Sequence, residues 1–587
     1  MISVSNEFKK AIKKTERQIK GYVEVLYDLP ASPLPEQTNT NIDSTYTSFD
    51  QVFNGMRVEN LYGSLDYLPL NGEYITMDDG INQNAGLISD ELAENLSVPH
   101  VVVGGLYQTT LNGITLYFRT NIPKNLRFIF NGDEIYDIEN NDKEMIQIIF
   151  DNPKTLNYII ISFFRMEYPD RKIYINEIDL GITQVYKDQD LIEFTVDEEV
   201  NKLVEEVPTN ETNITLNNMN NLFNPLNPSG IIPYLNQNSM IIPYIGVLTE
   251  NLGVEYVKMG EFYFDSYTNN PDSTTMLVGK NIIEQTKNMS IIQGLANHQE
   301  NNLIIDSSNP SMQDPRNTRK ALIESSGVEC EVSVNPLIAH TINYMKNCNL
   351  YDYLRDATAV TFGIVYANRN NKIIIKNPVL EIIDTLTKTE LINDIEYKQI
   401  DKINTINRKG VYYSGTSTQN SYEIINYSFT LANSQQLILV NHINLGGANI
   451  NYTGASSVEV KHETPFFSII NITGNVGDTV TLTEATNLDV CESERSRIIT
   501  NKLANEKEVI LETKTYLHNI SGSYETATGQ LDYAPSYEMR FDYNGDPSLE
   551  AGDYINVETP YGYKPLFIQK NHFKFDGGLE GYIGGVE

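Results

Sequence analysis

Phe194 to Tyr267 reads FTVDEEVNKLVEEVPTNETNITLNNMNNLFNPLNPSGIIPYLNQNSMIIPYIGVLTENLGVEYVKMGEFYFDSY, and its pattern indicates the class of fold. Short apolar runs separated by polar, Asn-rich and Pro-rich segments are typical of strands joined by turns. The expected strands are Phe194–Val196, Ile214–Leu216, Met240–Leu248 and Tyr256–Tyr267. Phe262 and Phe264 fall on one face of the last strand, which is therefore expected to be half buried. The stretch predicts a small β-barrel with a large loop stiffened by proline, and it carries no pocket chemistry.

The composition is strongly acidic. The chain has 587 residues, enough for about three to five domains of roughly 100 to 200 residues each. The chain has 43 Lys and Arg residues and 77 Asp and Glu residues, so its formal net charge is -34. Such a surface repels phosphate backbones at long range, so sequence-specific nucleic-acid binding is not expected.

Cysteine usage and hydropathy bear on the compartment. Cys330, Cys348 and Cys491 form no C-x-x-C pair, which predicts synthesis in a reducing cytoplasm. The opening residues are charged where a signal peptide would be apolar. The longest apolar run, Tyr158–Phe164, is too short to span a bilayer, so no stable membrane insertion is expected.

The N-terminal third predicts a helix, a strand and an inserted sandwich. Ser5 can cap a helix over Asn6–Lys14, followed by a strand over Gln18–Tyr27. Residues 44–182 carry short strands with polar turns, the pattern of a β-sandwich. Those strands are Ile114–Phe118, Leu126–Phe130, Ile146–Phe150 and Tyr158–Phe164, the last expected to be fully buried. The sandwich has two interpretations: a spacer, or a sugar or cell-wall binder. In the second, Asp78, Asp79 and Asn82 could present oxygen atoms to a ligand or a Ca²⁺ ion, without a convincing ligand spacing.

The remaining segments predict helices and a hairpin, followed by a strand region that is split by an insertion. The expected elements are a helix at Asp314–Ile323, a helix at Leu350–Ala359 and a hairpin of Gly363–Tyr366 with Lys372–Lys376. A strand region at Asn393–Tyr413 is interrupted by an insertion with strands at Ser428–Val440 and Phe466–Leu482 and a helix at Ser493–Asn505. Strict alternation over Tyr537–Tyr543 predicts a half-buried strand near the C-terminus.

No motif nominates a catalytic, cofactor-binding or metal-binding residue, and no cofactor is expected. Asp542–Asp553 has oxygen-bearing side chains at the positions of a calcium loop: Asp542, Asn544, Asp546, Ser548, Glu550 and Asp553. However, Pro547 replaces the required glycine, and strands are expected in place of the flanking helices. The seven histidines form no H-E-x-x-H motif, and Gly279-Lys280 lacks the rest of a phosphate loop. The chain is therefore not expected to be an enzyme.

Several runs resemble one family when they are taken in order. They are VSNEFKKAIKKTERQIKGYVEVLYD at the start, VPTNETNITLNN, FNPLNPSG and MGEFYFDS in the first barrel, and NGDPSLEAGDYINVET near the end. The chain thereby resembles the baseplate hub, or tail tip, proteins of tailed phages and phage-tail-like particles, among them minor tail proteins from prophages of Gram-positive hosts.

The resemblance implies a mainly β fold with an α+β insert: two tail-tube-like β-barrels, a small α/β domain and an inserted jelly-roll-like β-sandwich with a carbohydrate-binding-like fold. The expected divisions are an N-terminal helix, strand and linker (1–43), the sandwich (44–182), the first barrel (183–285), the α/β domain (286–385), the second barrel (386–415 and 505–587) and an insertion of unknown role (416–504).

The resemblance also implies a function. Hub proteins are homotrimers that cap the tail tube and connect it to the spike or fibres. The implied partners are two further copies of the chain, the tail tube or distal tail protein, and spike, fibre or other baseplate proteins. The expected location is a virion tail or phage-tail-like particle, such as a tailocin, assembled in the bacterial host cytoplasm. The alternative is a receptor-binding tail protein whose sandwich contacts host cell-wall polysaccharide; a wall hydrolase is a third hypothesis, which zymography would test.

Overall fold

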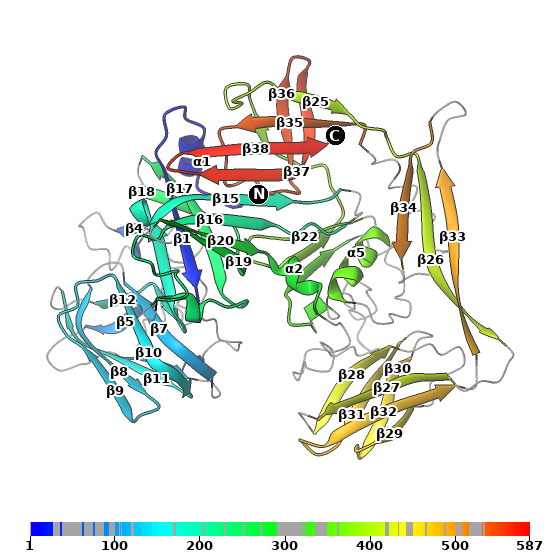
Figure 1. Cartoon of the computed structure of the whole chain (residues 1–587), viewed down its shortest axis with the longest axis horizontal. Helices are drawn as coiled ribbons and strands as arrows, with labels where there is room; N and C mark the ends of the chain where they lie inside the picture. The colour runs from blue at the N-terminus through cyan, green and yellow to red at the C-terminus, as the bar shows by residue number, and fades with distance from the viewer. Residues whose placement is uncertain are drawn as a thin grey trace.

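The chain is mainly β in a computed structural model (Figure 1). The structure describes residues 2–27, 36–37, 61–63, 74–76, 87–92, 100–104, 106, 109–118, 122–167, 172–202, 206–227, 230–250, 253–270, 273–289, 320, 323–324, 326–334, 349–360, 363–416, 422–431, 434–441, 450–463, 467–486, 489–500, 507–515, 531 and 535–586. Asp78, Asp79 and Asn82, and most of the helix expected at Asp314–Ile323, lie outside these residues.

A 14-stranded sheet forms the centre of the molecule. Its path is β14 (Thr183–Lys187), β1 (Ile19–Leu26), β17 (Met240–Thr249), β19 (Phe262–Asn270), β20 (Thr274–Lys280), β16 (Glu211–Asn217), β15 (Leu191–Glu199), β37 (Gly562–Phe575), β38 (Leu579–Val586), β35 (Tyr537–Tyr543) and β25 (Glu396–Gln399). Off this path, β18 (Gly253–Lys258) pairs with β17, and β36 (Tyr554–Thr559) pairs with β37 and with β24 (Ile382–Leu386). Along the described strands the path stays open at β14 and β25. The pairing of β15 with β37 divides the sheet into a first half, which contains β15, and a second half, which contains β37, and one apolar core lies beneath both.

The first half of the sheet contains the strands expected from the Phe194–Tyr267 stretch, with one correction. The run expected at Tyr256–Tyr267 is two strands, β18 and β19, separated by a break in which Gly260 has φ +142°. That backbone conformation suits glycine and ends the regular ladder. Phe262 is buried in the core and Phe264 packs against it, which confirms the half-buried face.

The N-terminal segment packs directly onto this sheet. Helix α1 (Asn6–Ile12) is capped by Ser5, whose Oγ accepts a hydrogen bond from the Phe8 amide at 3.0 Å. Phe8, Ala11 and Ile12 form its buried face. The helix ends two residues before the expected Lys14, and β1 then inserts between β14 and β17.

A second set of sheets with its own apolar core contains the strands expected between residues 44 and 182. One sheet runs β2 (Glu36–Gln37), β6 (His100–Gly104), β11 (Ile159–Met166), β8 (Pro123–Phe130) and β9 (Glu134–Ile138). The others are β10 (Met145–Leu156), β7 (Thr109–Tyr117) and β13 (Glu177–Asp179), and the pair β12 (Lys172–Ile175) with β5 (Leu87–Leu92). The expectation that Tyr158–Phe164 is fully buried is wrong: Ile159 and Ile161 are buried, whereas Phe164 is 43% exposed, because only one face of this sheet packs on the core.

The small α/β unit has the expected helix and hairpin. Helix α5 (Leu350–Val360) and the short α2 (Ile282–Thr286) pack near a sheet of β21 (Cys330–Ser333), β23 (Ile373–Lys376) and β22 (Ile364–Ala367). Two further strands, β3 (Leu61–Gly63) and β4 (Tyr74–Thr76), form a parallel pair.

The helix expected at Ser493–Asn505 is wrong over Ser493–Thr500, and residues 501–505 lie outside the described residues. β33 (Asp489–Thr500) is a strand that pairs along its whole length with β26 (Thr405–Thr416), and β34 (Ile510–Thr515) pairs with β26 on its other side. A long antiparallel ladder outweighs the local helical pattern, because strand preference depends on the tertiary partner.

The insertion also holds two small sheets. They are β27 (Tyr422–Thr430), β32 (Thr479–Thr486) and β29 (Ile450–Thr453), and β28 (Gln435–Asn441), β31 (Phe467–Thr473) and β30 (Ser457–Glu463). The β-like segments expected here, Ser428–Val440 and Phe466–Leu482, are confirmed: the first covers parts of β27 and β28, and the second covers parts of β31 and β32.

Candidate functional site

The two halves of the central sheet meet where β15 pairs with β37. We call this pairing the seam. On its inner face Phe194 lies opposite Phe575, with ring centroids 5.2 Å apart, and Val196 lies opposite Phe573. These four side chains are buried, so the seam is closed by apolar contacts between strands that are distant in sequence.

The outer face of the seam carries a ladder of opposite charges. Asp197 Oδ1 lies 2.7 Å from His572 Nδ1, and Glu199 Oε2 lies 3.1 Å from Lys570 Nζ. The hydrogen bond with Asp197 raises the pKa of His572 above its ordinary value, against the opposing effect of partial burial. The charges of the outer face thus favour the same register as the apolar inner face.

Glu198 breaks the apolar pattern of the inner face. It follows Phe194 and Val196 at the alternate positions of β15, and it lies opposite Asn571. Its side chain is 5% exposed, so its carboxylate needs partners within the protein.

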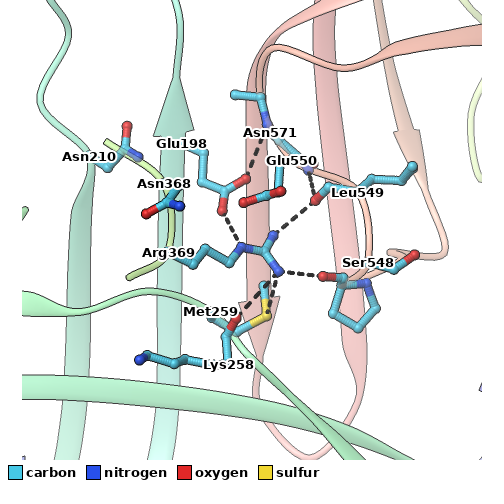
Figure 2. A network of polar contacts seen from close by, with 12 residues as sticks. Glu198, Asn210, Lys258, Met259, Asn368, Arg369, Ser548, Leu549, Glu550 and Asn571 are labelled. Atoms are coloured by element: carbon cyan, nitrogen blue, oxygen red, sulfur yellow. Dashed lines mark hydrogen bonds and ion pairs between the residues drawn. The ribbon is translucent and has the colours of Figure 1, made fainter. Parts of the chain in front are cut away.

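Arg369 supplies the main partner from the small α/β unit (Figure 2). It sits in the turn between β22 and β23, where Asn371 has φ +53° and Asn368 Oδ1 accepts from two backbone amides. Such Asn-rich geometry suits a tight turn. The turn directs the guanidinium toward the seam, where Nε donates to Glu198 Oε1 at 2.6 Å.

The remaining Arg369 donors reach a loop of the second half of the sheet. Nη2 donates to the Leu549 carbonyl at 2.9 Å, and Nη1 donates to the Pro547 carbonyl. The guanidinium carbon lies 5.7 Å from the centroid of the Phe573 ring. From its hairpin Arg369 therefore contacts β15, β37, the loop before β36 and, through Lys258 and Met259, the end of β18. We call this group the buried joint.

The electrostatics of the buried joint keep Arg369 charged. Burial alone would lower the pKa of Arg369, but attraction to Glu198 and Glu550 raises it above its ordinary value. Burial raises the pKa of Glu198, although Arg369 and the Ala551 amide, which donates to Glu198 Oε2 at 3.3 Å, oppose that change.

A second layer of polar contacts holds the loop. Asn571 Nδ2 donates to the Leu549 carbonyl at 3.0 Å, so this carbonyl accepts from both Asn571 and Arg369. The buried Tyr543 hydroxyl donates to Asn571 Oδ1 at 3.1 Å. The contact from Arg369 is charge-assisted, and all three contacts depend on one another, which favours one arrangement of the parts that they join.

Arg17 makes a comparable contact from the N-terminal segment. Its Nη1 donates to the carbonyls of Ile12 and Gly545, both at 2.9 Å, and its Nη2 donates to the carbonyls of Asn544 and Leu579. Burial lowers the pKa of Arg17. The segment before β1 is thereby tied to the second half of the sheet.

The acidic run Asp542–Asp553 forms a turn whose carboxylates have separate partners. Asp542 accepts from the Asn393 side chain, Asp546 from Ser548, and Asp553 from the Glu550 amide. Among the described residues, no group of three or more His, Cys, Asp or Glu side chains is placed to hold a metal ion. In that same part of the chain, no helix is long and apolar enough to cross a membrane.

The residues of the buried joint were missed by the sequence analysis. One signal could have found Glu198: an acidic residue at the inward position of a strand whose neighbours on that face are Phe194 and Val196. No local pattern identifies Arg369 as its partner, because 171 residues separate the two in the sequence.

Of the comparisons with known proteins, only the comparison with solved structures finds similar proteins. No protein-family model matches the sequence, and no curated protein matches it. A 43 kDa tail protein from prophage MuSo2 of Shewanella oneidensis is similar at 10% identity and a TM-score of 0.38, covering 69% of this chain and 96% of that one.

Two further tail proteins give comparable values. A tail protein from Neisseria meningitidis has 8% identity, a TM-score of 0.35 and coverage of 68% of this chain and 93% of that one. A prophage tail protein from Listeria monocytogenes has 9% identity, a TM-score of 0.30 and coverage of 68% and 91%. The other similar structures include PdpA-VgrG complexes of Francisella and a virion baseplate.

Proposed function

We propose that this chain is a structural tail-tip or baseplate hub protein that acts as a homotrimer. The observation that carries the proposal is the seam between β15 and β37, which joins two β units over one apolar core. In this proposal the two halves of the sheet are the two tail-tube-like units of each subunit. Three subunits then place six such units around the tail axis.

The buried joint supports a mechanical role. A hub holds its parts in one arrangement while load passes between a tube and a spike or fibres. A buried charge pair adds little net stability compared with apolar packing, but it penalises any arrangement that separates its partners. Arg369 and Glu198 therefore suit a protein in which the relative placement of parts matters. In this proposal the chain is not an enzyme.

The proposed partners follow from this role. They are further copies of the chain, the tail tube or distal tail protein, and spike, fibre or other baseplate proteins. The proposed location is a virion tail or phage-tail-like particle that is assembled in the bacterial cytoplasm. The formal charge of -34 suits a protein beside which DNA passes without sticking.

The test is the mass of the full chain in solution and its position in the particle. We expect light scattering to give three chains per particle and cryo-electron microscopy to place them at the end of the tail tube. A stable monomer that never co-purifies with tail tubes overturns the proposal.

A second candidate function is receptor binding by the sandwich. Phe164 is 43% exposed on the open face of its sheet, and the Arg127 guanidinium carbon lies 5.4 Å from the centroid of its ring. Aromatic and Arg side chains are both enriched at binding interfaces. In this proposal the full chain binds purified host cell-wall polysaccharide, and Phe164→Ala weakens that binding. Equal binding by both proteins, or none by either, contradicts it.

A further inference from the structure

A pocket of about 450 Å³ lies beside helix α1. Its lining includes Lys9, Lys10 and Lys13 from the helix, Asp384 from β24, and Asp546 and Ser548 from the loop that Arg369 also contacts. Sites for small ligands have volumes of about 300–1,000 Å³, so the pocket is large enough for a group of side-chain size.

The lysines of the pocket differ in their partners. Lys13 Nζ lies 2.8 and 2.9 Å from the two Asp384 oxygens and 3.6 Å from Glu390 Oε1. Lys9 and Lys10 are exposed, and within the described residues neither forms an ion pair. Lys14 forms the ion pair with Glu250, and the nearby charge of Lys10 also contributes to lowering the pKa of that carboxyl. In the part of the chain that the structure describes, the pocket therefore presents two ammonium groups without a direct counterion.

The wall opposite the helix presents a buried acceptor. Asp546 is 7% exposed, and its Oδ1 accepts from the Ser548 amide at 2.9 Å and from the Ser548 hydroxyl at 2.7 Å. Among the described residues, no hydrogen bond reaches Asp546 Oδ2. An occupant that complements both walls carries an anionic group for the lysines and an N–H donor for Asp546. A peptide segment with an Asp or Glu side chain supplies both.

We propose that this pocket binds an acidic segment of a second copy of the chain. The argument is charge complementarity: residues 1–27 contain six Lys or Arg and three Glu, in a chain whose formal net charge is -34. A neighbouring copy thus offers mainly acidic surface to a locally basic one. The inference rests on the homotrimer proposed above and adds the site through which copies recognise each other.

The experiment measures the trimer dissociation constant of the full chain by sedimentation, for the wild type and for Lys9→Glu/Lys10→Glu. We expect the constant to rise at least tenfold in the variant. Lys9→Ala/Lys10→Ala is expected to move it in the same direction by less, and Lys9→Arg/Lys10→Arg to leave it nearly unchanged. Raising the salt from 0.1 to 1 M shortens the screening length from about 10 to about 3 Å, so it is expected to weaken the wild-type trimer.

The matched control is Lys143→Glu/Lys402→Glu, which makes the same change in net charge. Both lysines are exposed and form no ion pair in the described part of the chain. If the wild type is a trimer, two results overturn this inference and leave the proposed hub intact. One is an unchanged trimer dissociation constant in Lys9→Glu/Lys10→Glu, and the other is an equal change of that constant in the control. A monomeric wild type overturns both.

Discussion

Arg369 and Glu198 form an ion pair, with 2.6 Å between Nε and Oε1, at the point where the small α/β unit meets both halves of the central sheet. Each side chain is 4–5% exposed. A pair this deeply buried makes its geometry costly to change, because separation leaves a charge without water or a counterion. The placement of the α/β unit therefore depends strongly on this pair.

Removing one member of the pair is expected to be strongly destabilising. Arg369→Met removes the main donor to the Glu198 carboxylate and the donor to the Pro547 carbonyl, and it leaves the Leu549 carbonyl with Asn571 alone. We expect a loss of about 3–5 kcal/mol in the free energy of unfolding, measured by urea denaturation. Arg369→Met/Glu198→Leu is expected to recover part of that loss, since no unpaired charge remains. The control is Lys507→Met, which removes the exposed Lys507–Asp401 pair; an equal shift in both single variants contradicts the role of the joint.

A methyl group at Gly581 is expected to disturb the joint from a distance. A Cβ atom there would overlap the ring of Tyr543, whose hydroxyl holds Asn571 in place. Overpacking of this kind costs about 1–3 kcal/mol, so Gly581→Ala is expected to lower the urea midpoint. Gly578→Ala is the control, because the nearest atom to a Cβ there is Asp576 Oδ1 at 3.8 Å. Identical midpoints for the two variants would show that Tyr543 can move freely.

His572 is expected to make the seam sensitive to pH. Its folded pKa is raised by Asp197, so its stabilising contribution is fully present below the unfolded value of about 6.5 and is lost as pH rises through the folded value. The unfolding midpoint of the wild type is therefore expected to exceed that of His572→Gln at pH 6, with a difference that shrinks by pH 9. Because the pair is partly exposed, the difference is small and is reduced by salt. A difference that grows with pH would reverse the sign of this argument.

Arg17 is expected to hold the N-terminal segment against the second half of the sheet. Arg17→Met leaves the carbonyls of Asn544, Gly545 and Leu579 without this donor, at a cost of about 1–3 kcal/mol for a buried group left unsatisfied. Limited proteolysis is expected to cut the segment before β1 faster in this variant. Lys20→Met, which alters an exposed side chain on β1, serves as the control. Equal cutting rates would show that the helix packing alone holds the segment.

Local sequence patterns predicted most of the strands. Non-local contacts decided two features that those patterns did not predict, strand β33 and the buried joint. Alternation over Tyr537–Tyr543 and the Ser5 cap identify elements that the structure contains, because both depend on neighbouring residues. The Ser493–Asn505 helix is wrong because the partner strand β26 lies outside any local window. The same reason hid the buried joint, since no sequence pattern at the β22–β23 turn shows that Arg369 meets Glu198.

The seam has a consequence for synthesis. Asp197 on β15 is synthesised 375 residues before its partner His572 on β37. At about 5–20 residues per second, that interval is roughly 20 to 75 seconds. During it, the apolar face of β15 and an unpaired strand edge stay open to other chains. Truncated mRNAs that end before β37 are therefore expected to yield aggregation-prone products. Neighbouring nascent chains are also expected to compete with β37 for the unpaired edge of β15.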